Sequence, residues 1–119
     1  MQLKKLNIQE ATKIEYNSKE LLFLAQSGQP YRGSLYVNFT SLGETIDLVA
    51  FKKYITSLRS VKLNAEDIAY EIYKTIKESI VVDDLGVVVD LSARGGLQQR
   101  LAYGKEFNPI IKQNIFQIN

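Results

Sequence analysis

The sequence predicts an α+β fold with the element order strand, strand, helix, helix, strand, strand, in which two helices cover one face of an antiparallel four-stranded sheet. Three patterns indicate this order. Apolar and polar residues alternate over 34–40 and again over 97–103, as in half-buried strands. Between them, residues 47–59 and 64–80 carry apolar side chains at helical spacing. Such a sheet leaves two unpaired edges, and closure of several copies into a ring is one way to remove them.

The first hairpin begins with one interrupted strand over 12–24, broken by the turn signal Asn17-Ser18. A loop is expected over 27–33, because Gly and Pro punctuate that stretch. Residues 1–9 are polar and basic, and they either fray or add an edge strand.

Each predicted helix has one apolar face. In the first helix this face consists of Leu48, Phe51, Ile55 and Leu58, with Lys52, Lys53 and Thr56 turned away. Asn64 followed by Asp67 is a capping-box-like start for the second helix. The apolar face of that helix consists of Ile68, Ala69, Ile72, Tyr73, Ile76 and Ile80.

The second hairpin begins after Asp83-Asp84, which reads as a solvated turn and lacks the further oxygen ligands that a metal site needs. Its strands are expected over 87–91 and 97–103, joined by a longer connection through residues 93–96. The tail over 105–119 is rich in Ile and Phe, and we expect it to pack on its own domain or on a neighbour.

Length and composition predict one globular domain over 1–119, with its core over about 12–104 and a C-terminal extension over 105–119. The net charge of +2 does not by itself indicate nucleic-acid binding. No apolar run approaches membrane-spanning length and no secretory leader is evident, so we expect a cytoplasmic protein.

The chain contains neither cysteine nor histidine. Disulfides, thiolate metal sites, Ser-His-Asp triads and Cys-His dyads are therefore excluded, and no metal is expected. Any acid–base chemistry must use carboxylates, lysine, tyrosine or water.

Glu66 lies in the first turn of the second predicted helix, where the helix dipole favours an ionised carboxylate. Two interpretations are open. Glu66 supports the helix cap, or it accepts hydrogen bonds from adjacent N–H groups of a ligand such as a guanine-like base.

Several basic residues also have two open interpretations, one structural and one functional. Lys52, Lys53 and Arg59 belong to an acid-free stretch from Leu48 to Ala65, which is either a solvated helix face or a contact for phosphate or the RNA backbone. Arg94 precedes two glycines and either cradles an anion or belongs to a tight turn.

Four short pieces, in order, resemble motifs of the 7-cyano-7-deazaguanine reductase (QueF) family, whose members have the tunnelling fold. A Cys-Pro-x-Thr-Gly-Gln-Pro-Asp loop corresponds to residues 24–31, and a Glu-x-Lys-x-x-Lys-x-Tyr-x-x-Ser-x-Arg helix resembles 47–59. Phe-His-Glu-Asp resembles 64–67, and Pro-Arg-Gly-Gly resembles 93–96. The resemblance covers roughly residues 14–104.

The resemblance implies a purine-type pocket at subunit interfaces of a homo-oligomer, a pentameric ring or a pair of rings. The glutamate matching Glu66 would anchor the base, with Gln29 and Ser57 at further ligand-binding positions. In this family a cysteine attacks the nitrile, an aspartate transfers a proton and NADPH donates hydride. A related branch, the QueF-like archaeosine synthases, uses a similar cysteine to convert the nitrile on tRNA into an amidine.

The sequence departs from the family at the reactive positions. Leu24 stands in place of the cysteine, Tyr31 in place of the aspartate and Ala65 in place of the histidine. Val49 breaks the helix motif tied to NADPH, so this cofactor is not expected. A slip of one residue would place Ala25 at the cysteine position but Arg32 at the aspartate position, which does not restore the site.

Three hypotheses follow from the sequence. The chain binds a 7-deazaguanine-type base, free or in tRNA, without reductase activity. Alternatively, it performs a cysteine-independent amidino transfer on nitrile-bearing tRNA, with ammonia as nucleophile. In the third hypothesis it is a structural ring-former without a ligand, in which Glu66 caps its helix.

Overall fold

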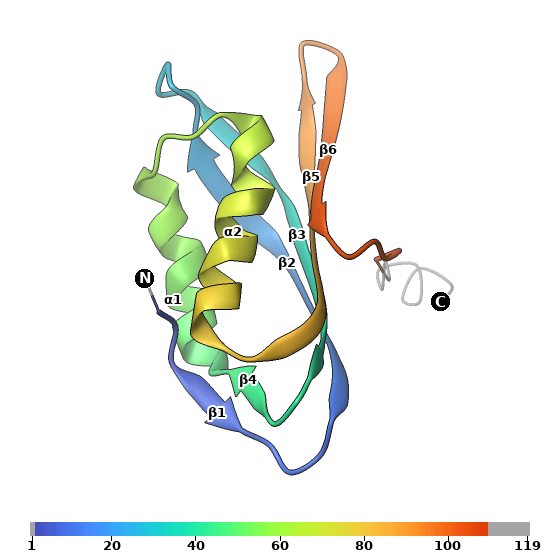
Figure 1. The fold of residues 1–119 in the computed structure, drawn as a ribbon. Coiled ribbons are helices and arrows are strands. Elements are labelled where there is room, and N and C mark those ends of the chain that lie inside the picture. The colour runs from blue at the N-terminus through green and yellow to red at the C-terminus, as the bar shows by residue number, and fades with distance from the viewer. Residues whose placement is uncertain (1, 110–119) are drawn as a thin grey trace, which may run out of the picture.

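A four-stranded antiparallel sheet carries two helices on one face in the computed structural model, which describes residues 2–109 (Figure 1). The sheet order is β2-β3-β5-β6, and this arrangement confirms the predicted α+β order. The sheet strands are β2 (Thr12–Leu24), β3 (Pro30–Ser41), β5 (Val82–Arg94) and β6 (Leu97–Gly104). The helices are α1 (Leu48–Ser57), the 3₁₀ turn η1 (Leu58–Ser60) and α2 (Ala65–Ser79), and β1 (Lys5–Asn7) pairs with β4 (Glu44–Ile46).

The hydrophobic core lies between the helices and the sheet. Leu35, Val37 and Phe39 of β3 are fully buried, as their alternation predicts. They belong to the same hydrophobic cluster as the predicted apolar face of α2, on which Ile68, Ala69, Ile72 and Ile76 are buried. Burial of these side chains is the main favourable term that holds the helices on the sheet. Within residues 2–109, neither helix is long and apolar enough to cross a membrane.

The first hairpin differs from expectation at its turn. Strand β2 is one strand with a register shift between Ser18 and Leu21, which confirms the predicted interruption. Strand β3 begins at Pro30, so the predicted loop over 27–33 is wrong in its second half. Proline is tolerated as the first residue of a strand, and the turn is closed earlier by a hydrogen bond from the Ala25 amide to the Gln29 carbonyl, at 2.8 Å.

The helix starts also differ in detail. The Asp47 carboxylate caps α1 by accepting from the Ala50 amide at 3.0 Å. Leu48 is 54% exposed, so its predicted place on the apolar face is wrong, because the first residue of the helix lies beyond the sheet contact. Tyr54 is buried instead. At α2 the Asn64 side chain makes no capping bond, so the predicted capping box is not formed.

The second hairpin is longer and tighter than predicted. Asp83 and Asp84 belong to β5 rather than to a turn, and Asp84 has a φ of 55° near a register shift against β3. Strand β5 runs on to Arg94, and only Gly95 and Gly96 connect it to β6. Both glycines have positive φ, as a two-residue type I′ hairpin turn requires. The predicted longer connection through residues 93–96 is therefore wrong.

An N-terminal arm crosses to the far end of α2. The predicted edge strand exists as β1, but it pairs with β4 outside the main sheet. Leu3 is buried in the core, and its amide donates to Ser79 Oγ at 2.8 Å. Glu44 fixes the arm, because its carboxylate accepts from Lys5 Nζ at 2.9 Å and from the Val81 amide at 3.0 Å. At the other terminus, the Lys105 amide donates to the Leu85 carbonyl, and the predicted packing of residues 110–119 lies outside the described residues.

Substitution Glu44→Gln is expected to lower the melting temperature at neutral pH. The hydrogen bond from Lys5, and then that from the Val81 amide, holds the pKa of Glu44 below its ordinary value of 4.5. Because the folded-state pKa is depressed, the stabilisation is present above the unfolded-state pKa and is lost as pH falls through the folded-state pKa. Thermal unfolding across the acid range should therefore show the two proteins converging at low pH.

The control is Glu106→Gln, since Glu106 is exposed and makes no described hydrogen bond within residues 2–109. A difference between wild type and Glu44→Gln that stays constant down the acid range would contradict the role given to the carboxylate.

Candidate functional site

Three segments from distant parts of the sequence meet at one end of the fold (Figure 1). They are the turn between β2 and β3, the start of α2 and the tip of the β5–β6 hairpin. Two side-chain contacts join them, from Arg94 to Gln29 and from Gln99 to Glu66. This end holds most of the residues that the sequence singled out as ligand-binding.

Glu66 is exposed in the first turn of α2, and its carboxylate turns toward the sheet. Its Oε2 accepts a hydrogen bond from Gln99 Nε2 of β6 at 3.3 Å. No described hydrogen bond joins this carboxylate to the amides of its own helix within residues 2–109. The side chain is therefore held by a neighbouring strand while it keeps the favourable position near the helix N-terminus.

Gln99 was not singled out by the sequence analysis. The available signal was its position in the strand, because Gln99 shares one face of β6 with Leu97 and Leu101, and this face turns toward α2. A polar residue on the face turned toward the helices is a candidate partner for another polar group. Leu97 beside it is 68% exposed, which leaves an apolar surface next to the Glu66–Gln99 pair.

At the same end of the fold, Arg94 of β5 contacts the turn between β2 and β3. Its Nη2 donates to Gln29 Oε1, and its Nη1 donates to the Pro30 carbonyl at 3.4 Å. The guanidinium carbon lies 4.8 Å from the centre of the Tyr31 ring, which stacks on Phe23 with a centroid distance of 5.0 Å. Arg94 thus binds the β2–β3 turn through charge-assisted hydrogen bonds and a cation–π contact.

Leu24, Tyr31 and Ala65, which the sequence resemblance aligns with the family's reactive residues, have structural roles here. The Leu24 amide donates to the Val61 carbonyl at 2.9 Å, and its carbonyl accepts from the Leu63 amide at 2.8 Å. Ala65 is almost completely buried. Tyr31 packs between Phe23 and Arg94. Leu24 and Ala65 cannot ionise, and none of the three is a thiol or an imidazole, so no nucleophile of the family type stands there.

Ser57 lies elsewhere. Its hydroxyl donates to the Tyr54 carbonyl at 2.5 Å at the end of α1, and it lines a hollow between α1 and α2 with Glu71 and Thr75. No described contact brings Ser57 to Glu66 within residues 2–109. The structure therefore groups Gln29, Tyr31, Arg94 and Glu66 at one end but leaves Ser57 outside the group.

The basic residues of the first helix are exposed, as predicted. Lys52 and Arg59 line a hollow of about 600 Å³ between α1 and β2, whereas Lys53 does not. Tyr16 and Phe51 contribute to the same lining, with ring centroids 5.3 Å apart. Across the part of the chain that the structure describes, no three acidic side chains are grouped as a metal site would require.

This arrangement of strands and helices is the tunnelling fold. The crystal structure of the archaeosine synthase QueF-Like in its apo form matches it with a TM-score of 0.69 at 16% sequence identity, covering 86% of this chain and 99% of the other. The match shows the fold and confirms the predicted fold class.

Sequence similarity points to particular relatives. The chain is 29% identical over 72 residues to the NADPH-dependent 7-cyano-7-deazaguanine reductase of Sulfurimonas denitrificans, and equally to that of Wolinella succinogenes. Each match covers 60% of this chain but only 58% of the relative. No protein-family profile matches the sequence. The resemblance to these reductases seen in the sequence motifs is confirmed.

Substitution Arg94→Lys is expected to loosen the β2–β3 turn. Lysine keeps the charge but loses the planar fork that bonds Gln29 and stacks on Tyr31, a contact worth about 0.5–1 kcal/mol at an exposed site. Hydrogen exchange of the Ala25 and Gly28 amides, both hydrogen-bonded in the turn, should become faster.

Arg59→Lys serves as the control, because Arg59 makes no described hydrogen bond or ion pair within residues 2–109. If hydrogen exchange of the Ala25 and Gly28 amides is the same in Arg94→Lys as in the wild type, Arg94 does not hold these segments together.

Proposed function

We propose that this chain binds a 7-deazaguanine-type base, free or within tRNA, in the pathway that makes queuosine or archaeosine, without reducing a nitrile. The observation that carries the proposal is the exposed Glu66 carboxylate, held at a helix N-terminus by Gln99 rather than by its own helix amides. The similarity to 7-cyano-7-deazaguanine reductases supports the choice of this class of ligand.

The chemistry of the pair suits such a base. A carboxylate accepts two adjacent N–H bonds, which the ring N–H and exocyclic amino group of a guanine-like base supply. The Gln99 Nε2 donates to Glu66 at 3.3 Å, and its second N–H and its Oε1 supply a further donor and acceptor beside the carboxylate. Exposed Leu97 supplies an apolar wall, and the Tyr31–Arg94 pair borders the same end.

A second copy is proposed to complete the pocket. Strands β2 and β6 are the two edges of the described four-stranded sheet. Within residues 2–109, the outer side of β2 forms a bridge at Leu24, to the segment around Lys62, and the rest of this edge precedes that bridge. Head-to-tail pairing of β2 with β6 of another copy would cover both edges and close a ring, with the Glu66 end at the contact. Leu97 and Tyr103, exposed along β6, would be covered by the same contact.

The absence of nitrile reduction is proposed from the residue types. The chain has no cysteine, so no thiolate can form a covalent thioimide, and Leu24, Tyr31 and Ala65 occupy the corresponding positions. NADPH is accordingly not expected to bind.

A thermal-shift titration with 7-cyano-7-deazaguanine, guanine and pterins tests the binding proposal. A ligand present at 100 times its Kd should add about 2.7 kcal/mol to the free energy of unfolding. Glu66→Gln should remove the shift, because it replaces the charged acceptor pair with one neutral acceptor, and Gln99→Leu should weaken it.

Glu78→Gln, at the other end of α2, is the matched control and should keep the full shift. A thermal shift that survives Glu66→Gln would place the base elsewhere, and no shift with any base would favour a structural ring.

Incubation with nitrile-bearing tRNA and ammonia, followed by nucleoside analysis, should give no amidine. Formation of amidine would overturn the assignment as a binding protein. Mass measurement after size exclusion should give an oligomer.

A further inference from the structure

We propose that the face of the sheet away from the helices is a docking surface for residues 110–119 of the same chain. Among residues 2–109 this face carries no helix, because α1 and α2 both lie on the other side of the sheet (Figure 1). The face is distinct from the two sheet edges. The docking surface therefore depends neither on the proposed base binding nor on pairing with a second copy.

The described end of the chain already turns onto this face. After β6, the Lys105 amide donates to the Leu85 carbonyl of β5 at 2.9 Å. The ring of Phe107 then lies over Gly86, since a Cβ atom added to Gly86 would be 2.9 Å from Phe107 Cδ1. Leu85 and Val87 are buried in the core, so Gly86 between them faces away from the helices. Phe107 is therefore on the helix-free side of the sheet.

This return of the chain partly covers an apolar surface. Tyr36 of β3 lies directly opposite Val88 of β5, and both side chains are buried on this face, outside the core cluster. Val88 and its neighbour Ala102 of β6 line a hollow of about 460 Å³ together with residues 104–108. Ala102 is exposed within residues 2–109. The hollow thus has an apolar floor, and the segment that leads to residue 110 forms one of its walls.

Residues 110–119 have the composition and the reach to cover this floor. They include five large apolar side chains and a single charged one, Lys112. Apolar side chains at this density are unfavourable in water. Ten extended residues reach up to about 33 Å, whereas the outer strands of a four-stranded sheet are only about 14 Å apart. Since the segment is tethered beside the hollow, its effective concentration there is high, which favours it over a separate partner.

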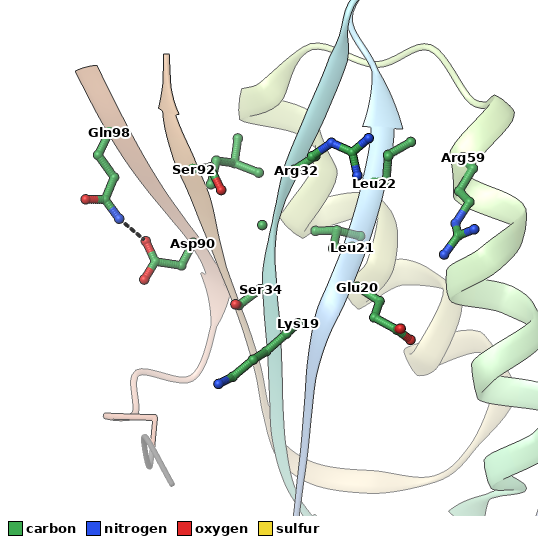
Figure 2. A pocket seen from close by; sticks show the side chains of 12 residues that line it. Lys19, Glu20, Leu21, Leu22, Arg32, Ser34, Arg59, Asp90, Ser92 and Gln98 are labelled. Atoms are coloured by element: carbon green, nitrogen blue, oxygen red, sulfur yellow. Dashed lines mark hydrogen bonds between the residues drawn. The ribbon is translucent and has the colours of Figure 1, made fainter. Parts of the chain in front are cut away.

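The polar part of the same face limits where the segment docks. Asp90 accepts from Gln98 at 3.1 Å and from Arg100 at 3.0 Å, and a dashed line marks the first of these bonds in Figure 2. Ser34 lies opposite Asp90 on β3 and continues this polar surface (Figure 2). Apolar side chains gain little there, so we expect them over the hollow near Val88.

The test uses the absence of cysteine, because one introduced thiol then reports on one position. Ala102→Cys places a thiol on the floor of the hollow, and its rate of alkylation by a maleimide measures how often that floor is open. In the full chain, Ile111→Ser, Ile115→Ser and Phe116→Ser together should raise this rate at least about tenfold, because the reagent reacts only while the cover is open.

Two controls match this comparison. Gln113→Ser with Asn114→Ser alters polar residues of the same segment and should leave the rate at Ala102→Cys unchanged. Ala69→Cys, buried in α2, should stay slow in the chain with the three serines. Each comparison is made at one thiol, so differences in thiol pKa between positions do not affect it. Phe107→Ser should also raise the rate at Ala102→Cys, because it removes the ring over the sheet.

Three results would overturn the proposal. The first is a rate at Ala102→Cys that the three serines leave unchanged. The second is an equal increase at Ala69→Cys, which would mean that the segment supports the whole fold rather than this face. The third is a rate at Ala102→Cys that rises when the parent chain is diluted, which would assign the cover to a second copy.

Base binding is a separate readout. The chain with the three serines should retain any base-dependent thermal shift, and Glu66→Gln should leave the alkylation rate at Ala102→Cys unchanged. Failure of one proposal is therefore distinguishable from failure of the other.

Discussion

The packing of α2 across the sheet is the interaction on which the rest of the structure depends. Ile68, Ile72 and Ile76 are fully buried against the strands, and this contact fixes the rotation of the helix. With that rotation set, Glu66 in the first turn lies beside β6, where Gln99 meets it. The position of the carboxylate therefore follows from apolar burial elsewhere on the same helix.

The opposite face of the sheet follows from the same constraint. Because side chains alternate along a strand, fixing Leu35 and Val37 toward the helices turns Arg32 and Ser34 toward the helix-free face. One sheet thus separates two polar regions of different character. The helix side presents a carboxylate at the Glu66 end, and the other face presents the exposed guanidinium of Arg32.

Much of this fold was predictable from the sequence, because hydrophobic periodicity is a local signal. The alternation around Val37 and the helical spacing through Ile72 predicted the correct elements. The errors occurred where tertiary contacts override local preference. Tyr54 is buried through its contact with Thr75 of α2. The Asn64 side chain does not make the predicted capping hydrogen bond at the start of α2. Of the candidate site, Glu66 was found from its helix position, whereas Gln99 needed knowledge of the strand opposite.

The Glu44 carboxylate has a consequence for local unfolding. It joins β4, where it lies, to Lys5 of the N-terminal arm and to Val81 at the connection between α2 and β5. Three stretches far apart in the sequence are thus fastened at one point. A local opening that displaces Glu44 breaks both bonds at once, so proteases directed at the chain start and at the α2–β5 connection should gain access through a common opening event.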